Sequence, residues 1–378
     1  MSSDIASLPR AAALMADLCA IPSPSRQEGE VAARVRAILT ELGAEVSEDD
    51  AAEAIPAGCG NIVARFPATA PGRPIAFCAH LDTVPNHGPI DVVVRDGFLT
   101  NAHDDILGGD DKAAVAAILE ATRRIVEDGI PHPGLELVFT PCEEIGLRGA
   151  AHLDPSVIAA DTVFVFDHTG PIGGIVTQAP SLRKVHATFV GRTAHAGIEP
   201  EKGRSAIVAA ARAISRMSLG RIDEGTTANI GTIEGGSATN VIAERCHVTA
   251  EARSLDDTVL AREIMGILDA LTWAATETEV DLETTVVSEF TGYRIPANDR
   301  GLALARRALR ACGLEPTDVT TGGGADTNAF RANGLSSINL CNDMIDVHTG
   351  SERIAVASIE RTVEVTLALV AASLDDAS

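Results

Sequence analysis

Short, almost continuously apolar runs place the strongest limit on how this chain can fold. The runs PIAFCAHLDTV, GLELVFTPCEE and DTVFVFDHTG are each bounded by Pro, Gly or acidic residues. Runs of this kind are typical of strands that are covered on both faces. Between the first two lies DDKAAVAAILEATRRIVEDG, in which apolar residues recur at helical spacing until Gly129. This alternation predicts an α/β fold with a mostly parallel, helix-covered sheet.

The pattern of predicted helices and strands changes near residue 180. From there the chain alternates strand-like segments with the helix GRSAIVAAARAISRM and a second helix from Leu255 to about Thr276. This predicts a smaller α+β unit with an antiparallel sheet. The final third returns to alternating helix-like and strand-like segments, as in the first part of the chain. We therefore predict a catalytic domain formed by residues 1–178 and 291–378, interrupted by an inserted lid or dimerisation-type domain over residues 179–290.

The composition disfavours several classes of partner. The formal net charge is -23 and only 3% of the residues are aromatic. A surface this acidic repels nucleic-acid phosphates and anionic lipid, and few aromatic side chains are available to stack on bases. The first residues contain no basic segment ahead of an apolar core, and no apolar run approaches the ~18 residues of a membrane helix. We expect a cytoplasmic protein that binds neither nucleic acid nor membrane.

Acidic and histidine side chains follow several of the predicted strands and helix starts. Ligands of α/β sheets collect at the carboxyl ends of strands. Nitrogen and carboxylate donors without thiolates suit zinc, cobalt or manganese, and grouped buried carboxylates are costly without a cation. The number of donors fits two ions about 3.5 Å apart. The candidates are His80, Asp82, Asp110, Asp111, Glu143, Glu144, Asp167 and His348.

Seven separated motifs resemble one family. Seven motifs occur in this order: HLDTVP, GGDDKAAVAAIL, PCEEIGLRGA, FDHTG, GRTAHAGIEPEKGRSAI, GGSATNVIAE and VHTGSERI. The resemblance that they carry spans about residues 15 to 370. Together they resemble the M20 family of dinuclear metallopeptidases, in its peptidase T-like branch. The resemblance implies a hydrolase of short peptides that uses two divalent metal ions. Zinc is the expected metal, with cobalt or manganese as alternatives.

The resemblance also implies a set of metal ligands. His80, Asp110 and Glu144 would bind one ion, and His348 and Asp167 would bind the other, with Asp110 bridging both. The peptide bond after the bridging Asp110 would be cis.

The resemblance implies roles at the metal site for Asp82 and Glu143, whereas two interpretations stay open for Asp111. Asp82 would accept the other ring N–H of His80 and so orient that ring. Glu143 would be the general base, taking a proton from a water held between the metals and passing it to the leaving amine. Asp111 is either the N-cap of the following helix or a support of the site.

The inserted segment carries three residues that the resemblance assigns to the substrate. His195 would stabilise the developing oxyanion, acting either in its own active site or in that of a partner copy. Asn240 and Arg253 would hold the substrate, and Arg253 could clamp a terminal carboxylate. The resemblance also implies that Asp326 or Thr327, in TGGGADTNAF, lies near the substrate. A homodimer through the inserted domain is possible.

The expected activity is that of a tripeptide aminopeptidase-like exopeptidase. Related branches with the same metal set act as carboxypeptidases, dipeptidases or N-acyl amino acid deacylases, so the substrate class within amide hydrolysis stays open. A catalytically silent relative would be expected to have lost a ligand or Glu143, and all of these residues are present.

Overall fold

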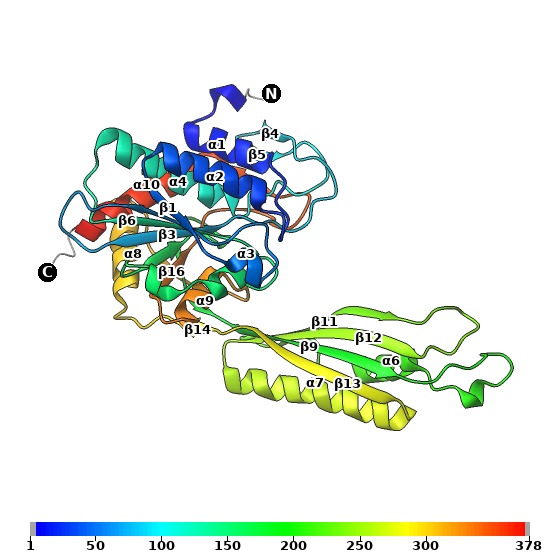
Figure 1. The fold of residues 1–378 in the computed structure, drawn as a ribbon. Coiled ribbons are helices and arrows are strands. Elements are labelled where there is room, and N and C mark those ends of the chain that lie inside the picture. The colour runs from blue at the N-terminus through cyan, green and yellow to red at the C-terminus, as the bar shows by residue number, and fades with distance from the viewer. Residues whose placement is uncertain (1–4, 375–378) are drawn as a thin grey trace. The chain divides into compact units, whose positions relative to one another are not determined.

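The computed structural model describes residues 5–374, which divide into two compact units. The first unit contains the described residues up to Thr177, Arg294–Thr320, and the described chain from Ala325 onward. The second contains Gln178–Tyr293 together with the short segment Thr321–Gly324. The chain thus leaves the first unit and returns to it, as the change of colour along the ribbon shows (Figure 1). The predicted boundaries did not include the separate placement of Thr321–Gly324.

The first unit is built around a nine-stranded sheet. Its strand order is β1-β2-β6-β3-β7-β16-β8-β14, and β15 pairs with β8. The strands are β1 (Glu45–Glu48), β2 (Ile62–Phe66), β3 (Ile75–His80), β6 (Leu135–Thr140), β7 (Val163–Val165), β8 (Gly174–Ala179), β14 (Tyr293–Arg294), β15 (Thr317–Thr320) and β16 (Ser337–Leu340). The four central strands β6, β3, β7 and β16 pair in parallel, whereas β1 with β2, β2 with β6, and β8 with β16 pair antiparallel. Every residue of β3 and β6 is buried, which matches strands covered on both faces.

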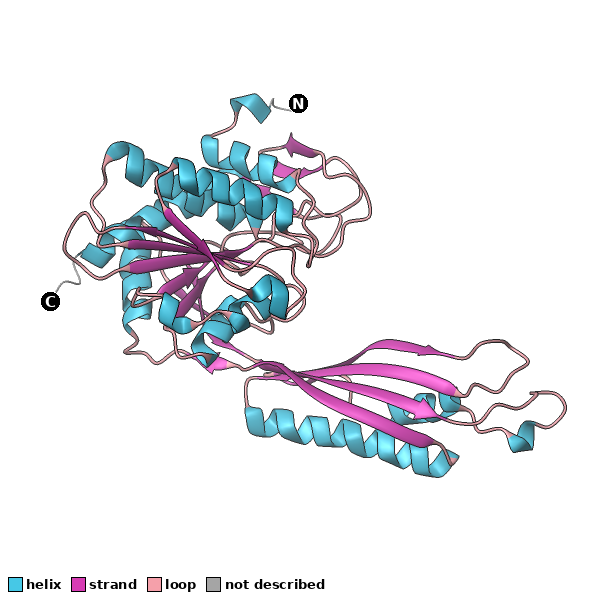
Figure 2. Ribbon diagram, in the orientation of Figure 1, coloured by secondary structure: helices cyan, strands magenta, loops and turns pink. Residues whose placement is uncertain are grey.

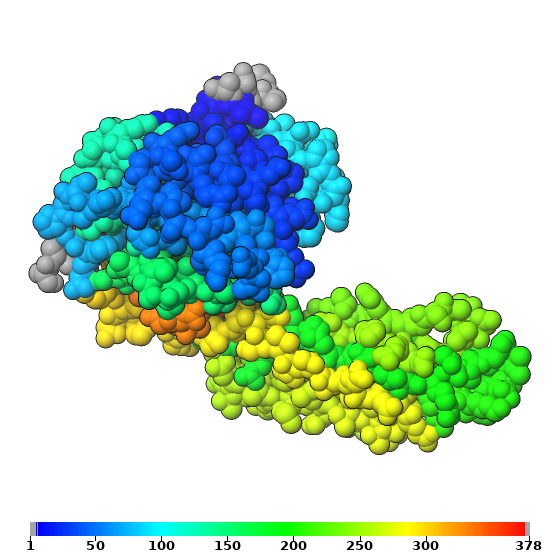
Figure 3. Space-filling model, viewed as in Figure 1, coloured from blue at the N-terminus to red at the C-terminus, as the bar shows by residue number. Residues whose placement is uncertain are grey.

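Helices cover both faces of this sheet, which confirms the predicted α/β class. They are α1 (Arg10–Cys19), α2 (Gly29–Glu41), α3 (Ala51–Ala54), α4 (Lys112–Asp128), α5 (Arg148–His152), α8 (Arg300–Ala311), α9 (Asp326–Ala332) and α10 (Val356–Leu374), with 3-10 turns η1 (Ile5–Ser7) and η2 (Pro155–Val157). α1, α4 and α10 pack on one another, and α4 rests on β3, while α9 packs on β7 and β16 from the other side (Figure 1). In the space-filling view the N-terminal part of the chain, coloured blue, forms much of the visible face of the first unit (Figure 3).

A three-stranded sheet with order β17-β5-β4 extends the first unit near the loops that carry Asp110 and His348. It consists of β4 (Val92–Arg95), β5 (Phe98–Asn101) and β17 (Arg353–Ala355). β4 and β5 form the predicted hairpin. Its turn residues Asp96 and Gly97 both have positive φ, at 51° and 84°, the geometry of a type I′ turn that a glycine adopts without steric cost. The pairing of β17 with β5 fixes the chain just after Glu352.

The second unit is a five-stranded antiparallel sheet with two main helices on one face (Figure 2). Its elements are β9 (Ser181–Val190), η3 (Pro200–Lys202), α6 (Ala206–Arg216), β10 (Gly220–Asp223), β11 (Thr226–Gly235), β12 (Arg245–Ser254), α7 (Asp257–Thr278) and β13 (Asp281–Phe290), with strand order β10-β11-β12-β9-β13. The two helices bury Ala- and Ile-rich faces against the sheet. Within residues 5–374, no helix is both long enough and apolar enough to span a membrane.

Candidate metal centre

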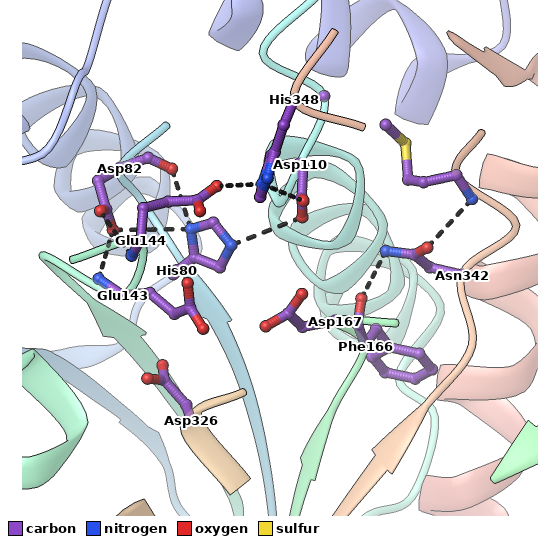
Figure 4. Close-up of polar contacts among 12 residues, drawn as sticks. His80, Asp82, Asp110, Glu143, Glu144, Phe166, Asp167, Asp326, Asn342 and His348 are labelled. Atoms are coloured by element: carbon purple, nitrogen blue, oxygen red, sulfur yellow. Dashed lines mark hydrogen bonds and ion pairs between the residues drawn. The ribbon is translucent and has the colours of Figure 1, made fainter. Parts of the chain in front are cut away.

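Three parallel strands deliver four of the predicted site residues to one edge of the main sheet. His80 is the last residue of β3. Glu143 and Glu144 follow the end of β6, and Asp167 follows the end of β7. Both β6 and β7 pair in parallel with β3, so their carboxyl ends meet around His80. Figure 4 shows these side chains pointing into one space.

Two loops complete the set. Asp110 stands two residues before α4 begins, and the peptide bond from Asp110 to Asp111 is cis, as the resemblance implied. His348 lies in the loop that leads into β17 and has a φ of 64°. Its ring faces Asp110 and Glu144 (Figure 4).

The Asp110 carboxylate lies between the two histidine rings. Its Oδ1 is 3.6 Å from His80 Nε2, and its Oδ2 is 3.3 Å from His348 Nε2. His348 Nε2 is also 2.9 Å from Glu144 Oε1. One carboxylate therefore faces both rings with different oxygens, which is what a ligand shared between two ions requires.

The distances favour a different division of the ligands from the one that the resemblance implied. One group of donor atoms within 4.8 Å of one another comes from His80, Asp110 and Asp167, and another comes from Asp110, Glu144 and His348. Among the described residues, Asp167 is thus grouped with His80 and not with His348, which differs from the expectation, whereas Glu144 is grouped with His348 and also with His80, as expected. Because β3 lies between β6 and β7, acids from both neighbours can reach His80, and sequence order cannot decide between them. A third group, His80 with Glu143 and Glu144, places Glu143 beside the same ring.

Because the cluster is buried, several negative charges together there are unfavourable, and bound cations would offset them. Burial raises the pKa of Glu143 and of Asp167 well above the usual carboxylate value, and raises the pKa of Glu144 as well. Burial opposes a charged His80, yet the carboxylates of Asp110 and Asp82 raise its pKa well above normal. Hydrogen bonds to Asp110 and Glu144 raise the pKa of His348 to about 10. A cation replaces these protons, so nitrogen and carboxylate donors at this density fit divalent metal ions.

These shifts predict that the metal-free protein loses stability as the pH rises from 6.5 to 8. The folded-state pKa of His80 and His348 lies above the unfolded value, so their contribution is complete below about pH 6.5 and declines above it. The raised pKa of Glu143 and Asp167 acts in the same direction. Calorimetry of chelator-treated protein should show a falling Tm, and added zinc should restore it most at pH 8. A Tm that rises over this range without metal would contradict the cluster's electrostatics.

Asp82 orients the site by a different route from the one expected. His80 Nδ1 lies 2.9 Å from the backbone carbonyl oxygen of Asp82, whereas the Asp82 carboxylate is 3.6 Å away. A carbonyl only accepts, so Nδ1 carries the proton and Nε2 is left to face Asp110. The carboxylate instead accepts the backbone N–H groups of Glu143 (2.8 Å) and Glu144 (3.1 Å) and the Ser25 hydroxyl (2.6 Å). Asp82 therefore fixes His80 through its main chain and the Glu143–Glu144 pair through its side chain.

Asp111 occupies the N-cap position of α4 without capping it. Its side chain makes no hydrogen bond to the first turn of the helix. Both carboxylate oxygens are buried and, among the described residues, have no hydrogen-bond partner. Burial raises the pKa of Asp111 well above its usual value. Asp111 therefore stands at the N-cap position of α4, but its side chain does not cap the helix.

Buried acids outside the ligand set were missed by the sequence analysis. Glu28 is fully buried, and its carboxylate accepts the backbone N–H groups of Arg26 (2.8 Å), Gly58 (2.7 Å) and Cys142 (3.2 Å). Cys142 directly precedes Glu143, so Glu28 fixes the backbone of the segment that carries Glu143. Glu352 is buried in the same way. In a single sequence such residues look like ordinary surface acids, and only their position against backbone donors distinguishes them.

Asp326 also proves to be a buried residue beneath the cluster. Only 1% of it is exposed, and its Oδ2 accepts the Thr140 hydroxyl at 2.5 Å. Thr327 is buried and contacts Ser337 through its hydroxyl. Both residues therefore make buried contacts inside the first unit, and their expected position near the substrate stays a prediction. Figure 4 shows Asp326 beyond Glu143.

The three predicted substrate residues lie in the second unit. His195 and Asn240 are exposed on adjoining loops, where Ala196 N–H donates to the Asn240 carbonyl at 2.9 Å. Arg253 lies on β12, where its Nε donates to Glu251 at 3.0 Å. The loops with His195 and Asn240 leave the sheet near Arg245, eight residues before Arg253, or roughly 27 Å along the strand. One copy of this unit therefore brings His195 and Asn240 together but keeps Arg253 at the other end of the sheet.

Comparisons with known proteins agree with this architecture. Residues 179–279 match the model of the M20 peptidase dimerisation domain, and residues 61–198 match that of peptidase family M28. YqjE, an uncharacterized protein of Bacillus subtilis (strain 168), is 36% identical over 354 residues, covering 94% of this chain and 95% of that protein.

Two solved structures are similar over almost their whole length. Aminopeptidase PepT from Bacillus cereus is 36% identical with a TM-score of 0.84, covering 97% of this chain and 98% of that one. A tripeptidase from Staphylococcus aureus is 33% identical with a TM-score of 0.90 and the same coverage. The chain therefore belongs to the M20 family of peptidases, in its peptidase T-like branch.

Proposed function

We propose that this peptidase is a metal-dependent exopeptidase that removes residues from short peptides, in the manner of a tripeptide aminopeptidase. The observation that carries the proposal is the Asp110 carboxylate, which faces His80 with one oxygen and His348 with the other. The similarity to an aminopeptidase and to a tripeptidase supports short peptides as the substrate class.

Two divalent ions fit the donor set, and we propose zinc, with cobalt or manganese as alternatives. His80, Asp110 and Asp167 would hold one ion, and Asp110, Glu144 and His348 would hold the other. When bound, such ions polarise a peptide carbonyl and lower the pKa of water. Asp82 keeps His80 and Glu144 in the orientation that this requires, through the contacts given above.

Glu143 is the residue that we assign to proton transfer. It is buried, stands beside His80 in the cluster, and has its backbone fixed by the Asp82 carboxylate. Burial raises its pKa well above the ordinary value, so its carboxylate is a better proton acceptor than a surface glutamate. It would take the proton from the attacking water at one carboxylate oxygen and donate it to the nitrogen of the departing amine.

The second unit would supply the substrate contacts. His195 is proposed to stabilise the oxyanion, and Asn240, on the adjoining loop, to hold the substrate. Arg253 would exchange its contact with Glu251 for a substrate carboxylate. The match to a peptidase dimerisation domain supports our further proposal that two copies pair through this unit.

A peptide panel tests the substrate class. Zinc-, cobalt- or manganese-loaded protein is incubated with di-, tri- and tetrapeptides that are free, N-acylated or C-amidated, and with N-acyl amino acids. Mass spectrometry should show loss of the first residue from free tripeptides and no cleavage of their N-acylated forms. Chelator-treated protein is the control for contaminating peptidases. Hydrolysis of the acylated compounds alone would identify a deacylase, and release of the last residue a carboxypeptidase. Both outcomes contradict the aminopeptidase proposal.

A further inference from the structure

Glu352 places one buried carboxylate against four successive backbone N–H groups. Only 2% of the residue is exposed. Its Oε2 accepts from Leu107 (2.9 Å) and Gly108 (3.0 Å), and its Oε1 accepts from Gly109 (2.8 Å) and Asp110 (3.0 Å). Each oxygen therefore accepts two hydrogen bonds from a segment that ends at Asp110, the residue that faces both His80 and His348.

Four donors compensate the cost of burying this charge and at the same time fix the shape of the loop. A buried carboxylate without partners would be strongly unfavourable, and charge-assisted hydrogen bonds are among the stronger ones in proteins. Gly108 has a φ of 66°, a conformation that L side chains rarely adopt. The segment has no regular secondary structure of its own, so its conformation depends on the acceptor that its N–H groups share.

The same glutamate is tied to the loop of His348. It follows His348 by four residues, and its own N–H donates to the carbonyl of Thr349 at 3.1 Å. Its carbonyl accepts the Thr100 hydroxyl at 3.3 Å, and the next residue begins the β17 strand that pairs with β5. The Glu352 side chain therefore connects the His348 loop to the Asp110 loop, and these two loops supply side chains that are 3.3 Å apart.

We infer that Glu352 is a positioning residue for the metal centre, which holds the Asp110 backbone at a fixed distance from His348. The inference rests on the proposed metal-dependent function. Because Glu352 touches neither substrate nor reacting atoms in this role, it acts through Asp110. Its loss should weaken metal binding even when the fold is intact.

Glu352→Gln is the direct test, because the amide keeps the shape of the side chain. Its –NH₂ group would face two backbone donors in place of an acceptor, so two of the four hydrogen bonds are lost. Replacing a residue that supports a metal ligand commonly lowers metal affinity by about 10–100-fold. We expect a loss of this size in Co²⁺ affinity and a changed visible spectrum of the Co²⁺-loaded protein.

Glu136→Gln is the matched control. Glu136 is also buried, with 4% exposed, and its carboxylate accepts the backbone N–H groups of Ala159 (2.9 Å) and Ala160 (2.8 Å). It lies near the start of β6, at the end opposite the metal ligands. It should lower the Tm of the metal-free protein in a comparable way while leaving Co²⁺ affinity and spectrum unchanged.

The experiment titrates full-length wild type and both variants with Co²⁺ against a competing chelator, and records the Tm of each without metal. If wild type binds no Co²⁺, the proposed function fails. If wild type binds and Glu352→Gln binds equally well, the inference about Glu352 fails. An equal loss in Glu136→Gln would also overturn it, since the effect would then follow general destabilisation. Should Glu352→Gln not unfold cooperatively, Glu352→Asp, which shortens the side chain by one methylene, must lose more affinity than Glu136→Gln.

Discussion

Glu143→Gln is expected to lower kcat by about 10²–10⁴-fold, the range that general acid–base catalysis contributes, while metal content stays at the wild-type level. The amide has the size of the carboxylate but accepts no proton at neutral pH. Its backbone N–H would still donate to Asp82, so the segment should keep its place. The measurement is kcat on the best free peptide, together with metal content by elemental analysis.

Glu41→Gln serves as the control for removing one negative charge. Glu41 is exposed at the end of α2 in the first unit and should have wild-type kcat and metal content when replaced. Near-normal turnover in Glu143→Gln would exclude the proton-transfer role. Loss of metal together with turnover would instead make Glu143 a ligand, which its position in a group with His80 and Glu144 allows.

Asp110→Asn should have the largest effect on the metal centre itself. An asparagine offers one acceptor oxygen and one –NH₂ group, so it cannot present an oxygen to both His80 and His348 as Asp110 does. We expect the variant to retain no more than one of the two ions and to lose activity by several orders of magnitude. Elemental analysis and Co²⁺ titration report the first effect, and peptide turnover reports the second.

Asp128→Asn, at the far end of the helix that follows Asp110, is the matched control. Asp128 is exposed at the last position of α4, whose first turn follows Asp110. Its replacement should alter neither metal content nor turnover. Full metal content in Asp110→Asn would show that this carboxylate is not shared between two ions.

Local chemistry in the sequence was sufficient for many elements of the fold. The helix over DDKAAVAAILEATRRIVEDG forms as Lys112–Asp128 and ends at Gly129, which has a φ of 63° that glycine adopts readily. The Asp96–Gly97 turn produces the predicted hairpin for the same reason. The continuous apolar runs became fully buried strands because helices cover both faces of the sheet.

The sequence also identified residues that gather at the candidate metal centre, and His80, Glu143, Glu144 and Asp167 meet there because the carboxyl ends of adjacent parallel strands meet. The sequence did not determine which of these residues would share an ion. Because β3 lies between β6 and β7, Asp167 and Glu144 can both reach His80, and Glu144 also reaches His348; that strand order arises from pairing across long sequence separations.

The supporting contacts were decided by tertiary structure alone. That Asp82 uses its carbonyl for His80, and that Glu352 holds the Asp110 loop, depends on backbone N–H and C=O groups. Every residue carries these groups, so they leave no signal in the sequence. Residue types and their order thus determined the fold class and the chemistry of the site, whereas the geometry that makes one carboxylate face two histidines came from how distant segments pack.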